Sequence, residues 1–452
     1  MQEVRDESRM VGWCETIQYP QTIEEIQKLI ETCRKSKQRI TIAGGKTGIA
    51  GGCIPQGGYL LCTEKYKNIR LEGEDKVTVS AGVTLEELQI YLRKNHTLYF
   101  APNPTEKTAT LCGLFACNGA GGNRRKHGTV ANNVEAITVV NGNGECMNVQ
   151  RGECLEWGVD IIDLFSGSEG QLGIVTDITL KLKQRESLLA LMAFFESEEE
   201  ALAYIQSLQQ WEYENNNQKI IEECEFFDAK TLGLLEQKKK SVEQLKWVPD
   251  FPEGLVCGIY VILSSNDDER LENTMMELYE RYLECGGKDE YTWGLEGLEE
   301  VEKLYKLRHC VPELLNAKLD KYSNQSERME KMGTDFTVDK SFIEYKKEIA
   351  KDGIEGYIFG HCLDNHYHID LFPHTLEEKE IVQKLLEGLY QEVKEKEGLV
   401  VTENGVGQLK QSFVSEIISE KTRIERQRMK SYFDSDGILG KSMAIWSGEI
   451  CI

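Results

Sequence analysis

The hydrophobic positions of the first 185 residues follow two periods. Apolar residues at Ile23, Ile26, Leu29 and Ile30 have the spacing of one helix face, and Thr22 stands before them as an N-cap. Helices are therefore predicted over 22–36 and 85–94. Short β-branched runs predict strands over 40–43, 77–83, 136–140 and 174–182. Because these elements do not repeat as regular βαβ units, the pattern favours an α+β fold.

From residue 187 onward the chain becomes more acidic. Strands such as 255–263 are each followed by a long charged helix, and 356–372 is expected to form two strands about a turn at 363–365. The last fifty residues have a mostly helical pattern. Three segments are thus expected: 1–186, 187–400 and 401–452.

Composition excludes several classes of function. The 452 residues have a formal charge of −23, which disfavours nucleic acid or an anionic membrane as partner. No apolar run reaches the length of a membrane span, and the N-terminus lacks the apolar core of a signal peptide. The 14 cysteines include no Cys-x-x-Cys pair, so we expect reduced thiols and a cytoplasmic protein.

Glycines are concentrated directly after the strand predicted at 40–43. The stretch 44–52 lacks the Gly-x-Gly-x-x-Gly of a Rossmann fold, and Gly45-Lys46-Thr47 lacks the first glycine of a P-loop. Two alternatives remain: a tight turn without a ligand, or a nest of backbone N–H groups around a pyrophosphate.

Four separated motifs resemble those of the FAD-linked D-2-hydroxyacid dehydrogenases, of the vanillyl-alcohol oxidase/p-cresol methylhydroxylase superfamily. They are Gly44 to Gly52, Ala101 to Thr129, Asp163 to Thr176 and Gly360 to His368. Their order and spacing match the family over most of the chain.

The resemblance implies a p-cresol methylhydroxylase-type fold with two domains. An FAD-binding domain (1–186) would be followed by an antiparallel-sheet substrate cap (187–400), and the segment 401–452 would return to the FAD domain. The implied flavin-binding residues are Gly44, Gly45, Lys46, Thr47, Gly48, Pro102, Thr105, Gly113, Asn118, Gly121, Gly122, Gly128, Gly173 and Val175. Because the first loop has no histidine, we expect non-covalent FAD.

Three of the seven histidines lie between 360 and 368. By strand alternation His366, His368 and Asp370 share one face, with His361 across the turn. From spacing alone they could hold a divalent metal or simply be hydrogen-bonded histidines of a hairpin. The resemblance implies that His361, His368 and Glu403 bind Zn²⁺, Mn²⁺ or Co²⁺.

Two positions depart from the family pattern. Asn404 stands where the family has its general-base histidine, and His366 stands where it has an asparagine. An amide cannot take a proton. We therefore expect His366 to be the base. Arg308 resembles the arginine that binds the substrate carboxylate, whereas Glu225 lies in a cap motif with no assigned role.

The resemblance implies an enzyme that transfers hydride from a D-2-hydroxy acid, such as a lactate-, glycolate- or 2-hydroxyglutarate-like compound, to flavin. Electrons would pass to an electron-transfer flavoprotein or another acceptor protein, and a homodimer is compatible with the sequence. Two alternatives stay open: a flavin-binding electron-conduit subunit of a larger complex, or a reductase of a different carboxylate on the same scaffold.

Overall fold

In the computed structural model, residues 1–156, 158–215, 219–239, 241–323 and 332–440 are described. The chain divides into two compact units. The first unit comprises Met1–Gly121, His127–Arg185 and Val401–Ile452, and the second comprises Gly122–Lys126 and Glu186–Val400. The C-terminal segment therefore returns to the unit in which the chain begins.

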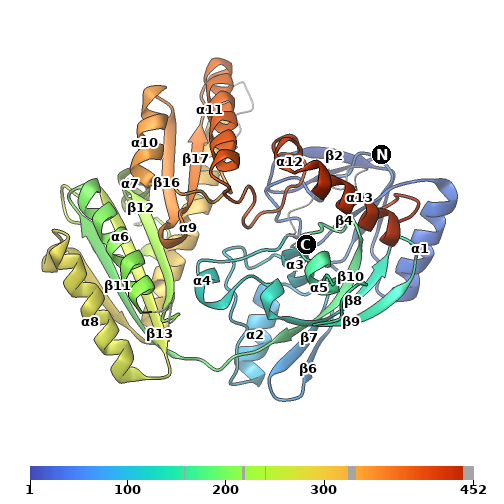
Figure 1. The fold of residues 1–452 in the computed structure, drawn as a ribbon, viewed down its shortest axis with the longest axis horizontal. Helices are drawn as coiled ribbons and strands as arrows, with labels where there is room; N and C mark the ends of the chain where they lie inside the picture. Colours follow the sequence, from blue (N-terminus) through green and yellow to red (C-terminus); the bar gives the residue numbers. More distant parts are fainter. Residues whose placement is uncertain (157, 216–218, 240, 324–331, 441–452) are drawn as a thin grey trace. The chain divides into compact units, whose positions relative to one another are not determined.

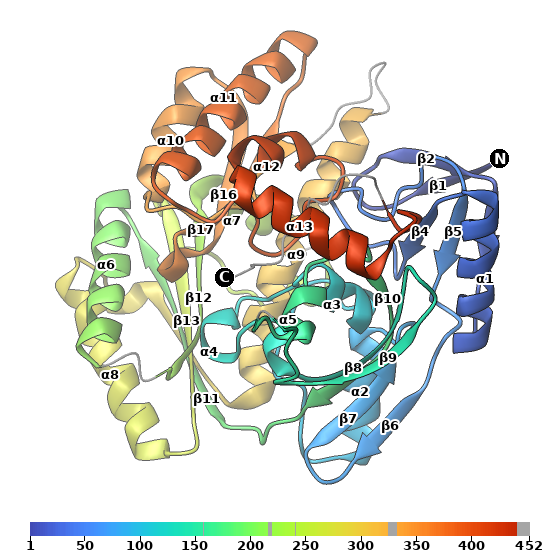
Figure 2. The same ribbon diagram turned by 45° about the vertical axis from the view of Figure 1, so that its right-hand side comes forward.

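Most strands of the first unit form two sheets. One is a parallel three-stranded sheet in the order β3-β5-β4, and the other is an antiparallel five-stranded sheet in the order β6-β7-β10-β8-β9 (Figures 1 and 2). A third, two-stranded pairing joins β1 and β2. The bounds are β1 Gln2–Arg5, β2 Val11–Cys14, β3 Thr16–Gln18, β4 Ile40–Ala43, β5 Tyr59–Cys62, β6 Ile69–Glu72, β7 Lys76–Ser80, β8 Val134–Asn141, β9 Cys146–Gln150 and β10 Gly173–Lys181.

Local sequence signals place the first two helices. Thr22 caps α1 (Ile23–Ser36), and Thr84 forms a capping box with Glu87 at the start of α2 (Leu85–Asn95). The strand predicted over 77–83 ends three residues early, because 81–83 form the turn into α2. The other helices of this unit are α3 Leu111–Ala116, α5 Ile161–Phe165, α12 Gln411–Ile417 and α13 Glu420–Phe433, and α4 Arg124–His127 lies at its boundary.

The C-terminal segment is part of the core of the first unit. The amide of Ile40 donates to the carbonyl of Ile438 at 2.7 Å, which extends the pairing of β4. The ring of Phe433 on α13 meets Phe165 edge-on at 5.1 Å. The first contact places Ile438 beside the strand that leads into the first glycine loop, and the second places α13 against Phe165 of α5.

The second unit is built on one seven-stranded antiparallel sheet, in the order β14-β11-β13-β12-β16-β17-β15. Its two strands at 355–372 confirm the predicted hairpin, with the turn at 362–365. The strand predicted over 255–263 is displaced by two residues. The bounds are β11 Ser187–Phe195, β12 Ile221–Asp228, β13 Cys257–Ser265, β14 Thr292–Glu296, β15 Met332–Gly333, β16 Glu355–His361 and β17 His366–Phe372.

Helices cover both faces of this sheet. Apolar residues of α7 and α9 form one core with side chains of β11, β13 and β16. On the opposite face, α6 and α8 contact β11 and β13 (Figure 1), and Phe342 of α10 stacks on Phe226 at 4.1 Å. The helices are α6 Glu198–Glu214, α7 Ala229–Lys238, α8 Asp268–Glu284, α9 Gly297–Ser323, α10 Phe342–Lys351 and α11 Leu376–Glu395.

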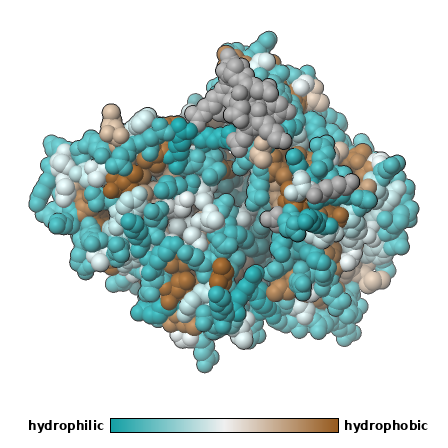
Figure 3. Space-filling model, turned by 180° about the vertical axis from the view of Figure 1, so that it is seen from behind, coloured by the Kyte–Doolittle hydropathy of each residue, from teal (hydrophilic) through white to brown (hydrophobic). Residues whose placement is uncertain are grey.

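The surface is consistent with the strongly acidic composition. On the face that Figure 3 shows, hydrophilic residues predominate and hydrophobic residues form only small patches. No helix within the described ranges is both long and apolar enough for a membrane crossing.

Candidate active site

The glycine loop after β4 packs closely against residues 108–110. A Cβ atom on Gly44 would collide with the hydroxyl of Thr110, and one on Gly45 would lie 2.7 Å from the carbonyl oxygen of Thr108. Only residues without a side chain allow this approach. The two glycines therefore fix the path of the loop where it leaves the sheet.

The next residues of the loop turn away from that packing. Lys46 has a φ of 57°, in the left-handed region, and its ammonium group lies 3.8 Å from the carboxylate of Glu64. A Cβ atom on Gly48 would meet no described atom within 4 Å. A nest for a pyrophosphate requires closely packed glycines followed by backbone amides that no side chain covers. The loop predicted to bind FAD therefore fits the pyrophosphate of that cofactor.

The second and third glycine-rich motifs meet this loop at α3. Thr110, which lies against Gly44, caps α3 by accepting a hydrogen bond from the amide of Gly113 at 3.3 Å. Just beyond α3, the side chain of Asn118 accepts a hydrogen bond from Ser166 at 3.2 Å. The structure therefore brings together three motifs that are far apart in the sequence.

Most of the other predicted flavin-binding residues lie in the first unit. Gly121 packs against the carbonyl of Asn103, and Gly128 has a φ of 75° against the side chain of Asn132. A Cβ atom on Gly173 would lie 2.7 Å from Val139. Pro102 is buried, Thr47, Thr105 and Val175 are half-buried, and Gly122 belongs to the second unit.

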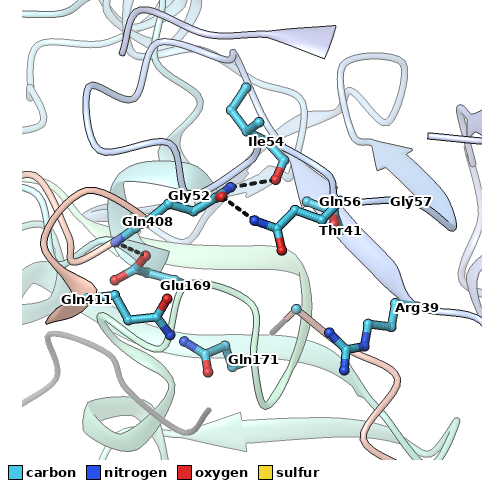
Figure 4. A pocket seen from close by; sticks show the side chains of 12 residues that line it. Arg39, Thr41, Gly52, Ile54, Gln56, Gly57, Glu169, Gln171, Gln408 and Gln411 are labelled. Carbon is cyan, nitrogen blue, oxygen red and sulfur yellow. Dashed lines mark hydrogen bonds between the residues drawn. The ribbon is translucent and has the colours of Figure 1, made fainter. Parts of the chain in front are cut away.

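Sequence reasoning missed the role of Glu169, in the third motif. Its carboxylate accepts hydrogen bonds from the amides of Val406 at 2.7 Å and Gly407 at 2.8 Å. It thereby anchors the loop that carries Glu403 and Asn404. Figure 4 shows Glu169 at the wall of a polar pocket within the first unit, together with Gln408, whose amide donates to the carbonyl of Ile54.

The histidines of the second unit gather on one face of its sheet. His361 pairs with His366 across β16 and β17, and Phe359 pairs with His368, so all three imidazoles point the same way. Their ring centroids lie 4.9–5.3 Å apart. His366 is 1 % exposed, and its Nε2 atom lies 3.5 Å from a carboxylate oxygen of Asp335. The predicted common face of β17 is confirmed.

A buried carboxylate joins this cluster to the predicted substrate-binding arginine. Glu225, on β12, accepts a hydrogen bond from Nε of Arg308 at 2.6 Å and is hydrogen-bonded through its other oxygen to Nδ1 of His361. Glu225 is 0 % exposed and Arg308 is 4 % exposed. Nη1 of Arg308 is buried and has no hydrogen-bond partner among the described residues, so it is available to an anionic ligand.

The network separates the acidities of two neighbouring glutamates. Burial opposes ionisation of Glu225, but His361 and Arg308 outweigh it and lower the pKa of Glu225 to about 2. Burial, and then the charge of Glu225, raise the pKa of Glu223 to about 8. Glu225 is therefore ionised at neutral pH, while Glu223 is mostly a neutral acid. The sequence signal for both was a pair of glutamates spaced by two, which places them on one face of the strand.

The structure thus brings together His361, His366, His368 and Arg308 in the second unit. Glu403 and Asn404 belong to the first unit, where Glu169 holds their loop. The metal set of His361, His368 and Glu403 stays a prediction, as do the roles of His366, Arg308 and Asn404. Within the second unit the donor types suit a metal, and hydrogen bonding of Nδ1 to Glu225 orients the ring of His361 as carboxylates orient ligating histidines.

The class of the protein is shown by two family models, and the glycine loop and the cluster of histidines with Arg308 fit it: an FAD-dependent oxidoreductase. Residues 15–150 match the family described as "FAD binding domain", and residues 185–442, more than half of the chain, match "FAD linked oxidases, C-terminal domain". The chain belongs to the FAD-linked oxidase family. The predictions of an FAD-dependent enzyme and of its family are confirmed.

Similar proteins support the same assignment. The chain is 26% identical over 449 residues to a D-lactate dehydrogenase of Anaerostipes hadrus, covering 95% of this chain and 87% of that protein. It is 24% identical to a D-2-hydroxyglutarate dehydrogenase of Stutzerimonas stutzeri, covering 94% and 89%.

Solved structures confirm the predicted fold class. The structure of p-cresol methylhydroxylase with bound substrate superimposes with a TM-score of 0.69 at 15% identity, covering 95% of this chain and 88% of that one. An alkyldihydroxyacetonephosphate synthase gives a TM-score of 0.67 at 16% identity, covering 93% and 76%.

Proposed function

We propose that the protein is an FAD-dependent dehydrogenase that oxidises the C2 hydroxyl of a D-2-hydroxy acid. The observation that carries the proposal is the buried Arg308–Glu225–His361 network, next to two further histidines on one sheet face. The names of the similar D-lactate and D-2-hydroxyglutarate dehydrogenases support the substrate class. Bound FAD would accept the hydride from C2.

Arg308 would bind the substrate carboxylate. Its Nε atom is held by Glu225, so the guanidinium is fixed in direction and its buried Nη1 is left to the ligand. The ring of Phe359 lies 4.8 Å from the guanidinium carbon and further restricts its movement. A substrate held in this way presents its C2 substituents in a constant orientation.

We propose that His361, His368 and Glu403 bind a divalent metal, Zn²⁺, Mn²⁺ or Co²⁺. Such an ion would lower the pKa of the substrate hydroxyl. Glu225 would orient the imidazole of His361, as second-shell carboxylates do for ligating histidines. Metal analysis after dialysis should show about one ion per chain, and His368→Ala should lose it. Full metal content in that variant would contradict the assignment.

We propose that His366 takes the hydroxyl proton, since Asn404 has no basic nitrogen. Loss of a general base slows a reaction by about 10²–10⁴-fold. His366→Asn should slow flavin reduction by that order while FAD and metal stay bound, and adding Asn404→His should restore part of the rate. An unchanged rate in His366→Asn would contradict this role.

The electrons would leave through an electron-transfer flavoprotein or another acceptor protein, and the sequence is compatible with a homodimer. The acidic surface would suit a partner with a basic docking face.

Anaerobic titration of the yellow protein with D- and L-2-hydroxy acids tests the function. D-Lactate or a related acid should bleach the flavin absorbance, and heat should release FAD into the supernatant. Arg308→Gln should weaken substrate binding by about 10²-fold or more. Arg281→Gln, on α8 of the same unit, is the matched control. If no acid bleaches the flavin absorbance, the result would instead support the electron-conduit or reductase alternatives.

A further inference from the structure

Glu223 lies on the same face of the sheet as the Arg308–Glu225–His361 network but is not one of its three members. The pairing of β12 with β13 sets Tyr260 opposite Glu225, and strand alternation turns Glu223 to the same side. Glu223 is 4 % exposed, and the hydroxyl of Tyr260 donates to one of its carboxyl oxygens. The other carboxyl oxygen is not used by Tyr260.

The carboxyl group of Glu223 also lies directly against Gly122. A Cβ atom on Gly122 would collide with that carboxyl group, so a glycine is required there. Gly122 closes the second predicted flavin-binding stretch. Glu223 therefore lies, within the second unit, between the Arg308 network and Gly122, a residue predicted from the sequence to bind the flavin.

Charged and polar groups on β12, β13, β16 and α9 influence the pKa of Glu223. Glu225 of the same strand disfavours the carboxylate form of Glu223, while His361 of β16 and Arg308 of α9 favour it, and Tyr260 of β13 donates to it. Burial outweighs the favourable contributions, and the raised pKa of about 8 leaves Glu223 neutral at pH 7. A neutral carboxylic acid in an enclosed site can donate a hydrogen bond.

The number of anion-binding groups limits what the site can hold. Glu225 already occupies Nε of Arg308, and only Nη1 is left over among the buried nitrogens of that side chain. One carboxylate can use it. A second carboxylate on the ligand would have no further nitrogen of Arg308 to pair with, and the ionised Glu225 beside it would repel it.

We propose that Glu223 is a specificity-determining residue that selects monocarboxylic 2-hydroxy acids with a small neutral substituent, such as hydrogen, methyl or hydroxymethyl, and rejects dicarboxylic ones. Its acid proton would donate to an oxygen of the ligand, and its bulk, together with the negative charge of Glu225, would exclude a second carboxylate. This inference rests on the proposed function and narrows its substrate class.

The test compares flavin reduction and ligand binding in the holoenzyme. The wild-type protein should be reduced by D-lactate or glycolate with a second-order rate constant about 10²-fold or more above that for D-2-hydroxyglutarate. Glu223→Ala should lower this ratio about tenfold or more, because it removes the acid and opens space. Glu223→Gln should keep the ratio near pH 7, since an amide resembles a neutral carboxyl group.

Binding without turnover gives a second readout. Oxamate, a monocarboxylate with a neutral amide, and 2-oxoglutarate, a dicarboxylate, should both perturb the flavin absorbance. Oxamate should bind more tightly to wild type, and the difference in affinity between the two ligands should narrow in Glu223→Ala. Above about pH 8, ionisation of Glu223 should weaken oxamate binding to wild type but not to Glu223→Gln. Glu355→Gln, a change at the far end of β16, is the matched control.

The outcomes separate the two proposals. Reduction by neither class of acid would overturn the proposed function and this inference with it. Reduction by D-lactate with an unchanged ratio in Glu223→Ala, or wild-type preference for D-2-hydroxyglutarate, would overturn the inference alone.

Discussion

Replacing Glu223 by glutamine should make the protein more stable at neutral pH. The ordinary pKa of a glutamate is 4.5, and in the folded protein burial and Glu225 raise that of Glu223 to about 8. The folded state therefore binds this proton more tightly than the unfolded chain does. The contribution of this proton to the free energy of unfolding is fully present below pH 4.5 and is lost as the pH rises towards 8. Glutamine keeps the shape and has no proton to lose.

The magnitude follows from the size of this pKa difference. Each pH unit inside the window removes about 1.4 kcal/mol of folding free energy through this group. Between about pH 5.5 and pH 7.5, wild type should lose about 2–3 kcal/mol relative to Glu223→Gln. Glu225 does not contribute to this slope, because its pKa of about 2 lies below the window.

Urea unfolding followed by tryptophan emission measures the effect. Trp211, Trp247 and Trp293 lie in the second unit and Trp13 lies in the first, so emission follows the unfolding of both units and the variants are compared with wild type in one assay. The difference in unfolding free energy between wild type and Glu223→Gln should grow with pH, while Glu355→Gln shows no such trend. A difference that is constant from about pH 5.5 to 7.5 would refute a proton held on Glu223 in the folded state.

Three further changes test other parts of the structure. Glu225→Gln should destabilise the second unit by about 3–5 kcal/mol in the same assay, because Arg308 is left buried without its counter-charge; wild-type stability would refute the ion pair. Gly44→Ala should abolish FAD binding, measured by flavin absorbance, because the added Cβ would collide with Thr110. Gly388→Ala is the control and should retain FAD, because Gly388 lies in open space on α11. A Gly44→Ala protein that still binds FAD would contradict the tight packing of the loop. Glu169→Ala should raise amide hydrogen exchange at 406–407 about tenfold through the loss of two hydrogen bonds, and unchanged exchange would show that Glu169 does not anchor the loop.

Local patterns in the sequence were sufficient for the elements that surround the flavin motifs. Thr22 and Thr84 start their helices as their side chains predict, since N-capping needs only neighbouring residues. The alternation of His366, His368 and Asp370 likewise predicted their common face, because a strand has a fixed period of two. The glycine clusters indicated either a tight turn or a nest for a pyrophosphate, because conformational freedom is a property of the residue itself.

Tertiary structure decided which distant side chains interact and in which ionisation state. Arg308 and His361 are 83 and 136 residues from Glu225 in the chain, and only the order of β12, β16 and α9 brings them to one carboxylate. Glu223 and Glu225 are alike in the sequence and two positions apart, yet one is neutral and the other ionised at pH 7. The physical reason is that burial and facing charges set a pKa, and both depend on the packing of the whole sheet rather than on the local sequence.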